Sequence, residues 1–320
     1  MCKLLVALPR KPAKQTGAAS PGCYVSAVTL IDAHVHLYPP EVNRDPAGWA
    51  VAAGEPHWAR LSTRKRKDGT PVQDFPSVDE LLRTMDRAGV SRAVLLGWYW
   101  EKPETCHWQN QFYAACVRQH PDRLSAFATL HPAAGRKGVL DELKSSRDAG
   151  LSGLGELSPH SQGYRMDDPV FEAAMEFAGR HGLPVNLHVT DPDSRDYPGR
   201  VETPLQDFVR LARKFPATTF VLAHWGGLLP LRSKRILPDN ILYDTAASPL
   251  LYEQDIWRKF CARVPAERVL FGSDFPLNVY PRIDARPNMD RLIAEAHRSE
   301  LNADQLKAIV SGNARRLLKH

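Results

Sequence analysis

The stretch LIDAHVHLYPP, residues 30–40, places two histidines one residue apart at the end of an apolar run. Residues i and i+2 of a β-strand face the same side of a sheet, so His34 and His36 are expected to point the same way. A lone buried histidine is more often a hydrogen-bonded core residue than a metal ligand. The role of this pair therefore depends on what stands at the ends of the other strands.

Seven further apolar runs of strand length follow, and amphipathic helical patterns lie between them. Helices are expected at 77–89, 167–182 and 203–216. Continuous apolar strands that alternate with helices are typical of a parallel sheet covered by helices. Eight such units predict an α/β fold, a distorted (β/α)8 barrel of the TIM type. The predicted strands cover residues 28–35, 92–98, 124–130, 151–157, 183–189, 218–224, 240–246 and 268–274.

The domain organisation is read from periodicity and connection length. Residues 1–27 lack periodicity and predict a mobile N-terminal arm, whereas residues 28–320 predict a single barrel domain. The connection at 37–76 is far longer than the few residues that usually join a strand to a helix. In a barrel this long loop would lie over the C-terminal mouth, where substrates bind.

The net charge of +6 is concentrated in two places. Residues 1–20 carry four basic side chains and no acidic one, and residues 60–67 carry five more, so the remainder is slightly acidic. This distribution indicates solvated basic segments and no nucleic-acid site. No apolar run reaches the roughly 18 residues of a membrane span, and no signal peptide is apparent. We expect a cytoplasmic protein that does not bind a membrane.

The pattern of the first strand recurs at the ends of four others. A barrel brings the C-terminal ends of its strands together, and a buried carboxylate is unfavourable unless it is paired or bound to metal. The six residues together therefore predict a metal site. Imidazole and carboxylate ligands without thiolate favour Zn²⁺, with Mn²⁺ or Fe²⁺ as alternatives, over Ca²⁺ or Mg²⁺. The six residues are His34, His36, Glu156, His188, His224 and Asp274.

This constellation resembles the amidohydrolase superfamily, in particular the amidohydrolase-related branch that includes aminocarboxymuconate semialdehyde decarboxylase and lactone hydrolases. The resemblance covers residues 29–319. It rests on DAHVH, on the histidines that close the fifth and sixth predicted strands, on FGSDFP and on the closing SGNARRLL.

The resemblance implies one or two divalent ions. By this carry-over His34, His36, His188 and Asp274 bind the first metal, and His224 is a ligand or a catalytic imidazole. Glu156 is expected to bridge two metals, to hydrogen-bond a ligand, or to form a structural salt bridge. Many relatives have a carboxylated lysine on the fourth strand, and this chain has none.

The implied activity is metal-assisted hydrolysis of a carbonyl substrate such as a lactone, ester or amide. In this scheme Asp274 acts as general base and then acid, and His224 stabilises the developing oxyanion. The same branch supports an alternative, the decarboxylation of a small unsaturated or aromatic acid. A metal-dependent nuclease and a barrel without enzymatic activity are less favoured by the acidic body and the intact ligand set. Relatives often form dimers, so a homodimer is possible.

Weaker candidates lie just beyond the strand ends. His131 and His160 could contact a small-molecule substrate, and Trp225, directly after His224, could line its pocket. Trp98, Trp100 and Trp108 are expected to pack under the long connection. Three arginines in loops could bind a substrate carboxylate through paired hydrogen bonds, which makes an anionic substrate plausible: Arg195, Arg200 and Arg232.

Overall fold

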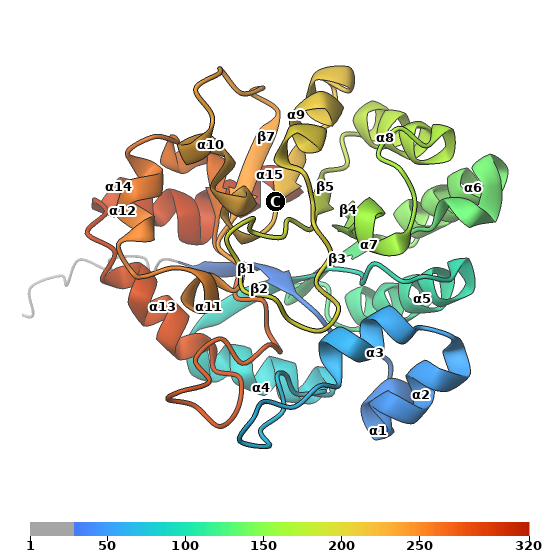
Figure 1. Cartoon of the computed structure of the whole chain (residues 1–320), viewed down its shortest axis with the longest axis horizontal. Coiled ribbons are helices and arrows are strands. Elements are labelled where there is room, and N and C mark those ends of the chain that lie inside the picture. The colour runs from blue at the N-terminus through green and yellow to red at the C-terminus, as the bar shows by residue number, and fades with distance from the viewer. Residues whose placement is uncertain (1–28, 320) are drawn as a thin grey trace, which may run out of the picture.

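Eight parallel strands form one sheet in sequence order, and helices surround it (Figure 1). This computed structural model describes residues 29–319, so the predicted arm at 1–27 lies outside the described residues. The last strand region returns to the first, because Val35 bridges Phe275 in parallel and the Asp274 N–H donates to the His34 carbonyl at 3.0 Å. The predicted (β/α)8 barrel is confirmed.

Each of the eight predicted strands is present, and most are shorter than their apolar runs. The second begins two residues earlier than predicted, and the eighth is only two residues long. The chain leaves β-geometry where the polar residues of the mouth begin. The strands are β1 Leu30–Val35, β2 Val90–Leu95, β3 Leu124–Ala128, β4 Gly153–Leu157, β5 Val185–Leu187, β6 Phe220–Leu222, β7 Ile241–Asp244 and β8 Val269–Leu270.

The predicted helices are confirmed as α4, α8 and α9. In α4, Ser77 accepts a hydrogen bond from the Glu80 N–H, and the Glu80 carboxylate accepts one from the Ser77 N–H, which forms a capping box. The outer helices are α4 Val78–Ala88, α5 Pro103–Gln119, α6 Gly135–Asp148, α8 Pro169–His181, α9 Leu205–Lys214, α12 Ile256–Cys261, α13 Met289–His297, α14 Ala303–Lys307 and α15 Asn313–Leu318. Short helices follow β4, β6 and β7: α7 Pro159–Gln162, α10 Leu229–Arg232 and α11 Ser248–Leu251.

The connection at 37–76 is not a loop throughout, which corrects the prediction. It contains three short helices, α1 Pro40–Arg44, α2 Pro46–Ala53 and α3 Pro56–Ser62, each with proline in its first turn. They lie together at one side of the barrel (Figure 1). Aromatic side chains pack beneath them, including the tryptophans predicted to do so: Tyr38, Trp49, Trp58, Trp98, Trp100 and Trp108.

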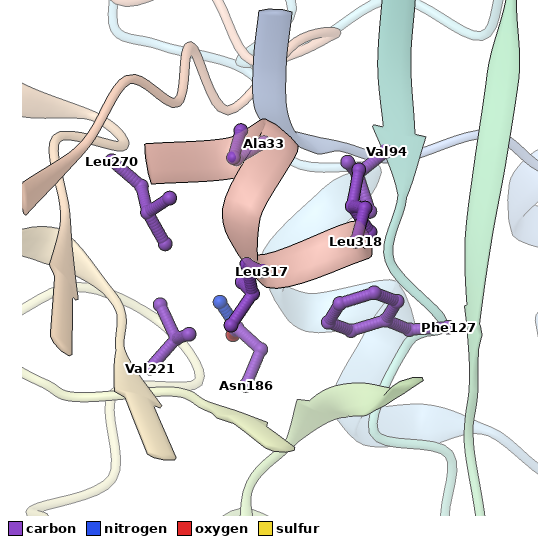
Figure 2. Close-up of a pocket in the computed structure, with 9 residues that line it drawn as sticks. Ala33, Val94, Phe127, Asn186, Val221, Leu270, Leu317 and Leu318 are labelled. Carbon is purple, nitrogen blue, oxygen red and sulfur yellow. The ribbon is translucent and has the colours of Figure 1, made fainter. Parts of the chain in front are cut away.

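The floor of the barrel is closed by α15. Its side chains Ala314, Leu317 and Leu318 meet inward-facing apolar residues of the strands, and only a void of about 10 Å³ remains among them (Figure 2). The opposite, C-terminal end of the strands is therefore the open one. No helix in residues 29–319 combines the length and the apolarity needed to cross a membrane.

A register shift in β1 determines where its two histidines point. Ile31 and Ala33 pack inside the barrel, whereas Val35 packs in the layer between strands and helices. The pairing with β2 shifts between Asp32 and Val35, so His34 and His36 also face inward. Asp32 holds this kink, because its carboxylate accepts hydrogen bonds from the N–H groups of His34 and Ser273, at 3.1 and 2.9 Å.

Candidate metal centre

Three of the predicted ligands form one cluster at the open end of the barrel. The Nε2 atoms of His34, in β1, and of His36, directly after it, lie 3.2 Å apart. Asp274 follows β8 in a left-handed conformation, φ 66°, and its Oδ1 lies 3.7 and 3.6 Å from these two nitrogens. All three residues are buried, and their atoms could be ligands of one ion.

The other three predicted ligands form a second cluster beside the first. Glu156 Oε1, from β4, lies 3.0 Å from His188 Nδ1 and 3.7 Å from His224 Nε2. Its second oxygen, Oε2, lies 3.7 Å from His36 Nε2 and 3.9 Å from His34 Nε2. Glu156 therefore stands between the two clusters, and all six residues meet in one place.

Hydrogen bonds of the outer ring nitrogens fix the protonation of the first cluster. His36 Nδ1 must donate, because its partner at 3.0 Å is the carbonyl oxygen of Leu96. His34 Nδ1 donates to the carboxylate of Asp244 at 2.9 Å. When both rings are neutral, the lone pairs of the two Nε2 atoms face each other across 3.2 Å. This arrangement requires a positive charge between them, either a metal ion or a proton.

The pKa values describe the same pair of rings in the metal-free chain. Burial alone would lower the pKa of His34, but the Asp244 and Glu156 carboxylates raise it to about 10. Burial and the charge on His34 lower the pKa of His36 to about 3. Without a metal, the proton on His34 would supply the positive charge. Burial also raises the pKa of Asp274 to about 7, against the attraction of His34.

Asp244, at the end of β7, organises the centre although the sequence analysis did not identify it. Besides His34, its carboxylate accepts hydrogen bonds from Asn186 Nδ2 at 3.0 Å and from the backbone N–H of His224 and Ala246, at 3.0 and 3.1 Å. It is completely buried. An acidic residue at a strand end is the same signal that pointed to Asp274. The predicted strand at 240–246, NILYDTA, could therefore have indicated Asp244 as well.

The turn that carries His224 has a left-handed backbone, with φ between 55 and 59° from Trp225 to Leu228. Gly226 is required there, because a Cβ atom would lie 2.7 Å from the ring of Tyr243. His224 Nδ1 donates to the Ala246 carbonyl at 3.1 Å, which leaves the Nε2 lone pair facing the centre. Burial and the charge on His188 lower the pKa of His224 to about 4, so the ring is neutral.

A cavity of about 980 Å³ opens above the centre. His36, Glu156, His188, His224 and Asp274 form part of its lining. Its remaining wall combines aromatic rings with arginines and polar groups, several of them from the connection at 37–76: Leu61, Ser62, Arg64, Gln73, Trp98, Tyr99, Tyr197 and Arg195 among others. The prediction that this connection borders the mouth is confirmed.

Three weaker predictions need correction, because the residues do not line the cavity. Trp225 is completely buried, donates to Ser248 Oγ at 2.9 Å and packs edge-on against Trp257. His131 caps a turn by accepting from the Ala133 N–H. His160 hydrogen-bonds Asp207 at 2.9 Å.

The three arginines have different surroundings. Arg232 is paired with Asp193 at 2.7 Å, and Arg200 hydrogen-bonds Ser194 at 3.0 Å. Arg195 lines the cavity, is exposed, and has no ion pair within residues 29–319, so its role in substrate binding stays a prediction.

Comparisons with known proteins agree with this architecture. A family model described as Amidohydrolase matches residues 31–319. No curated protein sequence matches the chain significantly.

Solved structures of similar fold include 5-carboxyvanillate decarboxylase from Sphingomonas paucimobilis, with 17% identity, a TM-score of 0.70, and coverage of 92% of this chain and 99% of that one. The 5-carboxyvanillate decarboxylase from Novosphingobium aromaticivorans, with manganese and 4-hydroxy-3-methoxy-5-nitrobenzoic acid, has 16% identity, a TM-score of 0.71 and coverage of 91% and 96%. A dihydroxybenzoic acid decarboxylase from Polaromonas sp., with manganese and 2-nitroresorcinol, has 19% identity, a TM-score of 0.64 and coverage of 91% and 97%. At these identities the similarity shows the shared fold. Because the family match spans nearly all of the described residues, the chain belongs to the amidohydrolase family.

Proposed function

We propose that this chain is a metal-dependent decarboxylase of a small aromatic carboxylic acid. The observation that supports metal binding is the pair of facing Nε2 atoms of His34 and His36, 3.2 Å apart, because the Nδ1 atoms of both rings act as donors to the protein. The choice of reaction is supported by the three similar structures described above, which are named as decarboxylases of substituted aromatic acids, two of them with manganese.

His34, His36, His188 and Asp274 would hold the ion, with His224 and Glu156 beside it. When bound, a divalent ion supplies a positive charge that orients an anionic substrate and stabilises the negative charge that develops on it. Imidazole and carboxylate donors suit Mn²⁺ and Zn²⁺, so both belong in the test.

Asp274 is the group best suited to move a proton. It is a buried carboxyl at the centre, with Oδ1 3.7 and 3.6 Å from the Nε2 atoms of His34 and His36, and a carboxyl in that place can hold and pass on a proton. It would donate this proton to the ring carbon as the bond to the carboxylate breaks and carbon dioxide leaves, and would then recover a proton from water. The neutral His224 can accept a hydrogen bond from a substrate hydroxyl at Nε2.

The cavity wall suits an aromatic ring. Trp98 and Tyr99 stack with their ring centroids 4.4 Å apart, and both line the cavity. Trp98 lies 5.2 Å from the ring of His36, and Tyr99 lies 5.2 Å from that of His188. These flat surfaces therefore flank the ligand histidines, where a planar substrate would lie against them.

Hydrolysis of a lactone, ester or amide, which the sequence analysis favoured, is retained as a second candidate because of one observation. Glu156 stands between the two clusters and has an oxygen directed to each. A carboxylate in that place could be shared by two ions, and a two-metal centre is suited to activating water.

The test combines metal analysis with a substrate panel. The purified chain, loaded separately with Mn²⁺ and Zn²⁺, is incubated with 2,6-dihydroxybenzoate, 5-carboxyvanillate, a lactone, an ester and an amide. Carbon dioxide release from the aromatic acids, lost in His34→Ala and kept in the exposed control His181→Ala, is expected. Hydrolysis without carbon dioxide release would favour the second candidate, and a chain that binds no transition metal would exclude both.

A further inference from the structure

The cavity above the metal centre is larger than an acid with a single ring needs. Its volume is about 980 Å³, at the upper end of the roughly 300–1,000 Å³ of pockets that hold ligands of drug size. A benzene ring with a carboxylate and small substituents would leave most of this space to water. The chemistry of the lining beyond the centre therefore indicates which further group of a substrate the cavity takes.

One part of the lining is apolar and comes from two segments of the chain. Helix α11 follows β7, and the segment 277–283 follows β8. These two strands pair in the sheet, so both segments leave the barrel on the same side. Their apolar side chains, which we call the apolar wall, line the same cavity as the metal centre: Pro249, Leu250, Leu251, Val279, Pro281 and Ile283.

Buried carboxylates hold both segments of this wall in place. Glu295, in α13, accepts hydrogen bonds from the Tyr280 hydroxyl at 2.8 Å and from the Trp257 indole at 2.9 Å. Tyr252, directly after α11, donates to the carboxylate of Asp191. Tyr252 and Tyr280 also line the cavity. Because the proton of each hydroxyl is already bound to a carboxylate, these tyrosines offer a ligand the surface of their rings.

Two members of the apolar wall are exposed although they are large. Leu250 is 41% exposed and Ile283 is 64% exposed. Single apolar side chains are common on surfaces, but two that border the same cavity mark a place where an apolar group of a ligand can leave water. Glu253 and Arg282, the charged residues of the same region, also line the cavity and are exposed, so their charges can stay in solvent.

The other charged and hydrogen-bonding residues of the lining come mainly from different connections. Arg64 follows α3, and Asp193, Ser194 and Arg195 lie between β5 and α9. The lining is therefore divided, with the apolar wall contributed by the connections that follow β7 and β8. A ligand that fills the cavity would carry an apolar group on that side.

We propose that the apolar wall binds a bulky apolar substituent of the substrate, such as a second aromatic ring, while the ring that bears the carboxylate lies at the metal centre. This inference rests on the proposed function and narrows its substrates to aromatic acids larger than a single ring. Trp98 and Tyr99 flank the ligand histidines and would contact the first ring. Burial of the substituent removes apolar surface from water, which strengthens binding in proportion to the area buried.

Three simple acids test the proposal by binding alone. Benzoate has one ring, and biphenyl-3-carboxylate and biphenyl-4-carboxylate add a second ring in two directions. Isothermal titration calorimetry gives their affinities for the manganese-loaded full chain, unchanged and as Leu250→Ser and Ile283→Ser. Ile236→Ser is the matched control, because Ile236 is 93% exposed and does not line the cavity.

At least one biphenyl acid is expected to bind the unchanged chain roughly tenfold or more tightly than benzoate. Leu250→Ser and Ile283→Ser should each reduce that affinity about three- to tenfold and leave the binding of benzoate unchanged, since they remove part of the apolar contact. Melting temperatures should not fall, because both side chains are exposed. Biphenyl acids that bind no better than benzoate, or a gain that survives both substitutions, would overturn the proposal.

Sedimentation velocity of the same variants distinguishes a ligand site from a contact between copies of the chain. A changed oligomeric state with unaltered binding of the biphenyl acids would assign the apolar wall to a second copy and overturn the proposal. Selective loss of biphenyl binding in the two variants, without carbon dioxide release from any aromatic acid, would support the apolar wall and refute only the proposed reaction.

Discussion

Replacing Asp244 with asparagine is expected to weaken metal binding by changing which nitrogen of His34 carries the proton. An asparagine keeps one oxygen, which can remain with the backbone N–H groups of His224 and Ala246. Its NH₂ group then faces His34 Nδ1, where the carboxylate oxygen now accepts at 2.9 Å. His34 Nδ1 must become the acceptor, so the proton moves to Nε2, the atom that faces His36.

The size of the effect follows from the place of this carboxylate. Substitution of a group that orients a metal-binding histidine typically lowers metal affinity about 10–100-fold, or about 1.4 to 2.8 kcal/mol. We expect the upper half of this range, because Asp244 holds both the ring of His34 and the backbone of His224. Competition with a chromophoric chelator gives the dissociation constant for Mn²⁺ and Zn²⁺, and ¹⁵N NMR identifies the tautomer of His34.

Asp191→Asn is the matched control. Asp191 is also a buried carboxylate beside the cavity, and it accepts hydrogen bonds from Tyr252 and Arg232 without touching a histidine of the centre. This variant should be less stable and should bind metal as tightly as the unchanged chain. Unaltered metal affinity in Asp244→Asn, or an equal loss in the control, would refute the reasoning.

Three further predictions concern protons. The pKa of His34 is raised to about 10 and that of Asp274 to about 7 in the metal-free chain, so metal uptake at pH 8 should release about one proton per ion, chiefly from His34. Metal affinity should also rise with pH. Calorimetry in buffers of different ionisation enthalpy measures both, and uptake without proton release would contradict the proposed charge balance. Burial raises the pKa of Glu55 from 4.5 to about 7, so the folded state holds this proton more tightly than the unfolded state. The contribution of Glu55 to the free energy of unfolding should therefore fall by about 3 kcal/mol as the pH rises from 4.5 to 7. Urea unfolding at several pH values tests this, because the unchanged chain should show the pH dependence and Glu55→Gln should not. Asp274→Asn should reduce carbon dioxide release at least a hundredfold, because the amide has no proton acidic enough to be donated to the ring carbon. A single-turnover assay tests this when the metal content of the variant matches that of the unchanged chain. Near-normal turnover would show that Asp274 does not donate the proton.

The fold and the six-residue centre could be predicted because both follow from one regularity. Apolar strands of a parallel barrel end at a common edge, so ligand-type residues at those ends converge wherever they stand in the sequence. The direction of His34 needed more than alternation, since the register shift after Asp32 turns the histidine pair inward. That shift is held by the carboxylate of Asp32, which accepts a hydrogen bond from the Ser273 N–H in the segment after β8, a contact that no local pattern reveals.

The errors arose where the chain leaves regular structure. Trp225 was expected in the pocket because it follows His224, but the left-handed backbone there places the indole in the core against Trp257. The connection at 37–76 has short helices of 5 to 8 residues, too few for helical periodicity to be recognised.

The position of α15 in the floor of the barrel affects how the chain can be made. A ribosome releases all eight strands before it releases Asn313–Leu318, so a nascent barrel lacks its floor until α15 has emerged from the ribosome. During that interval the apolar side chains of Ile31, Val94 and Phe127 are without the helix that covers them. Translational pausing shortly before this helix would prolong their exposure to chaperones and to other nascent chains.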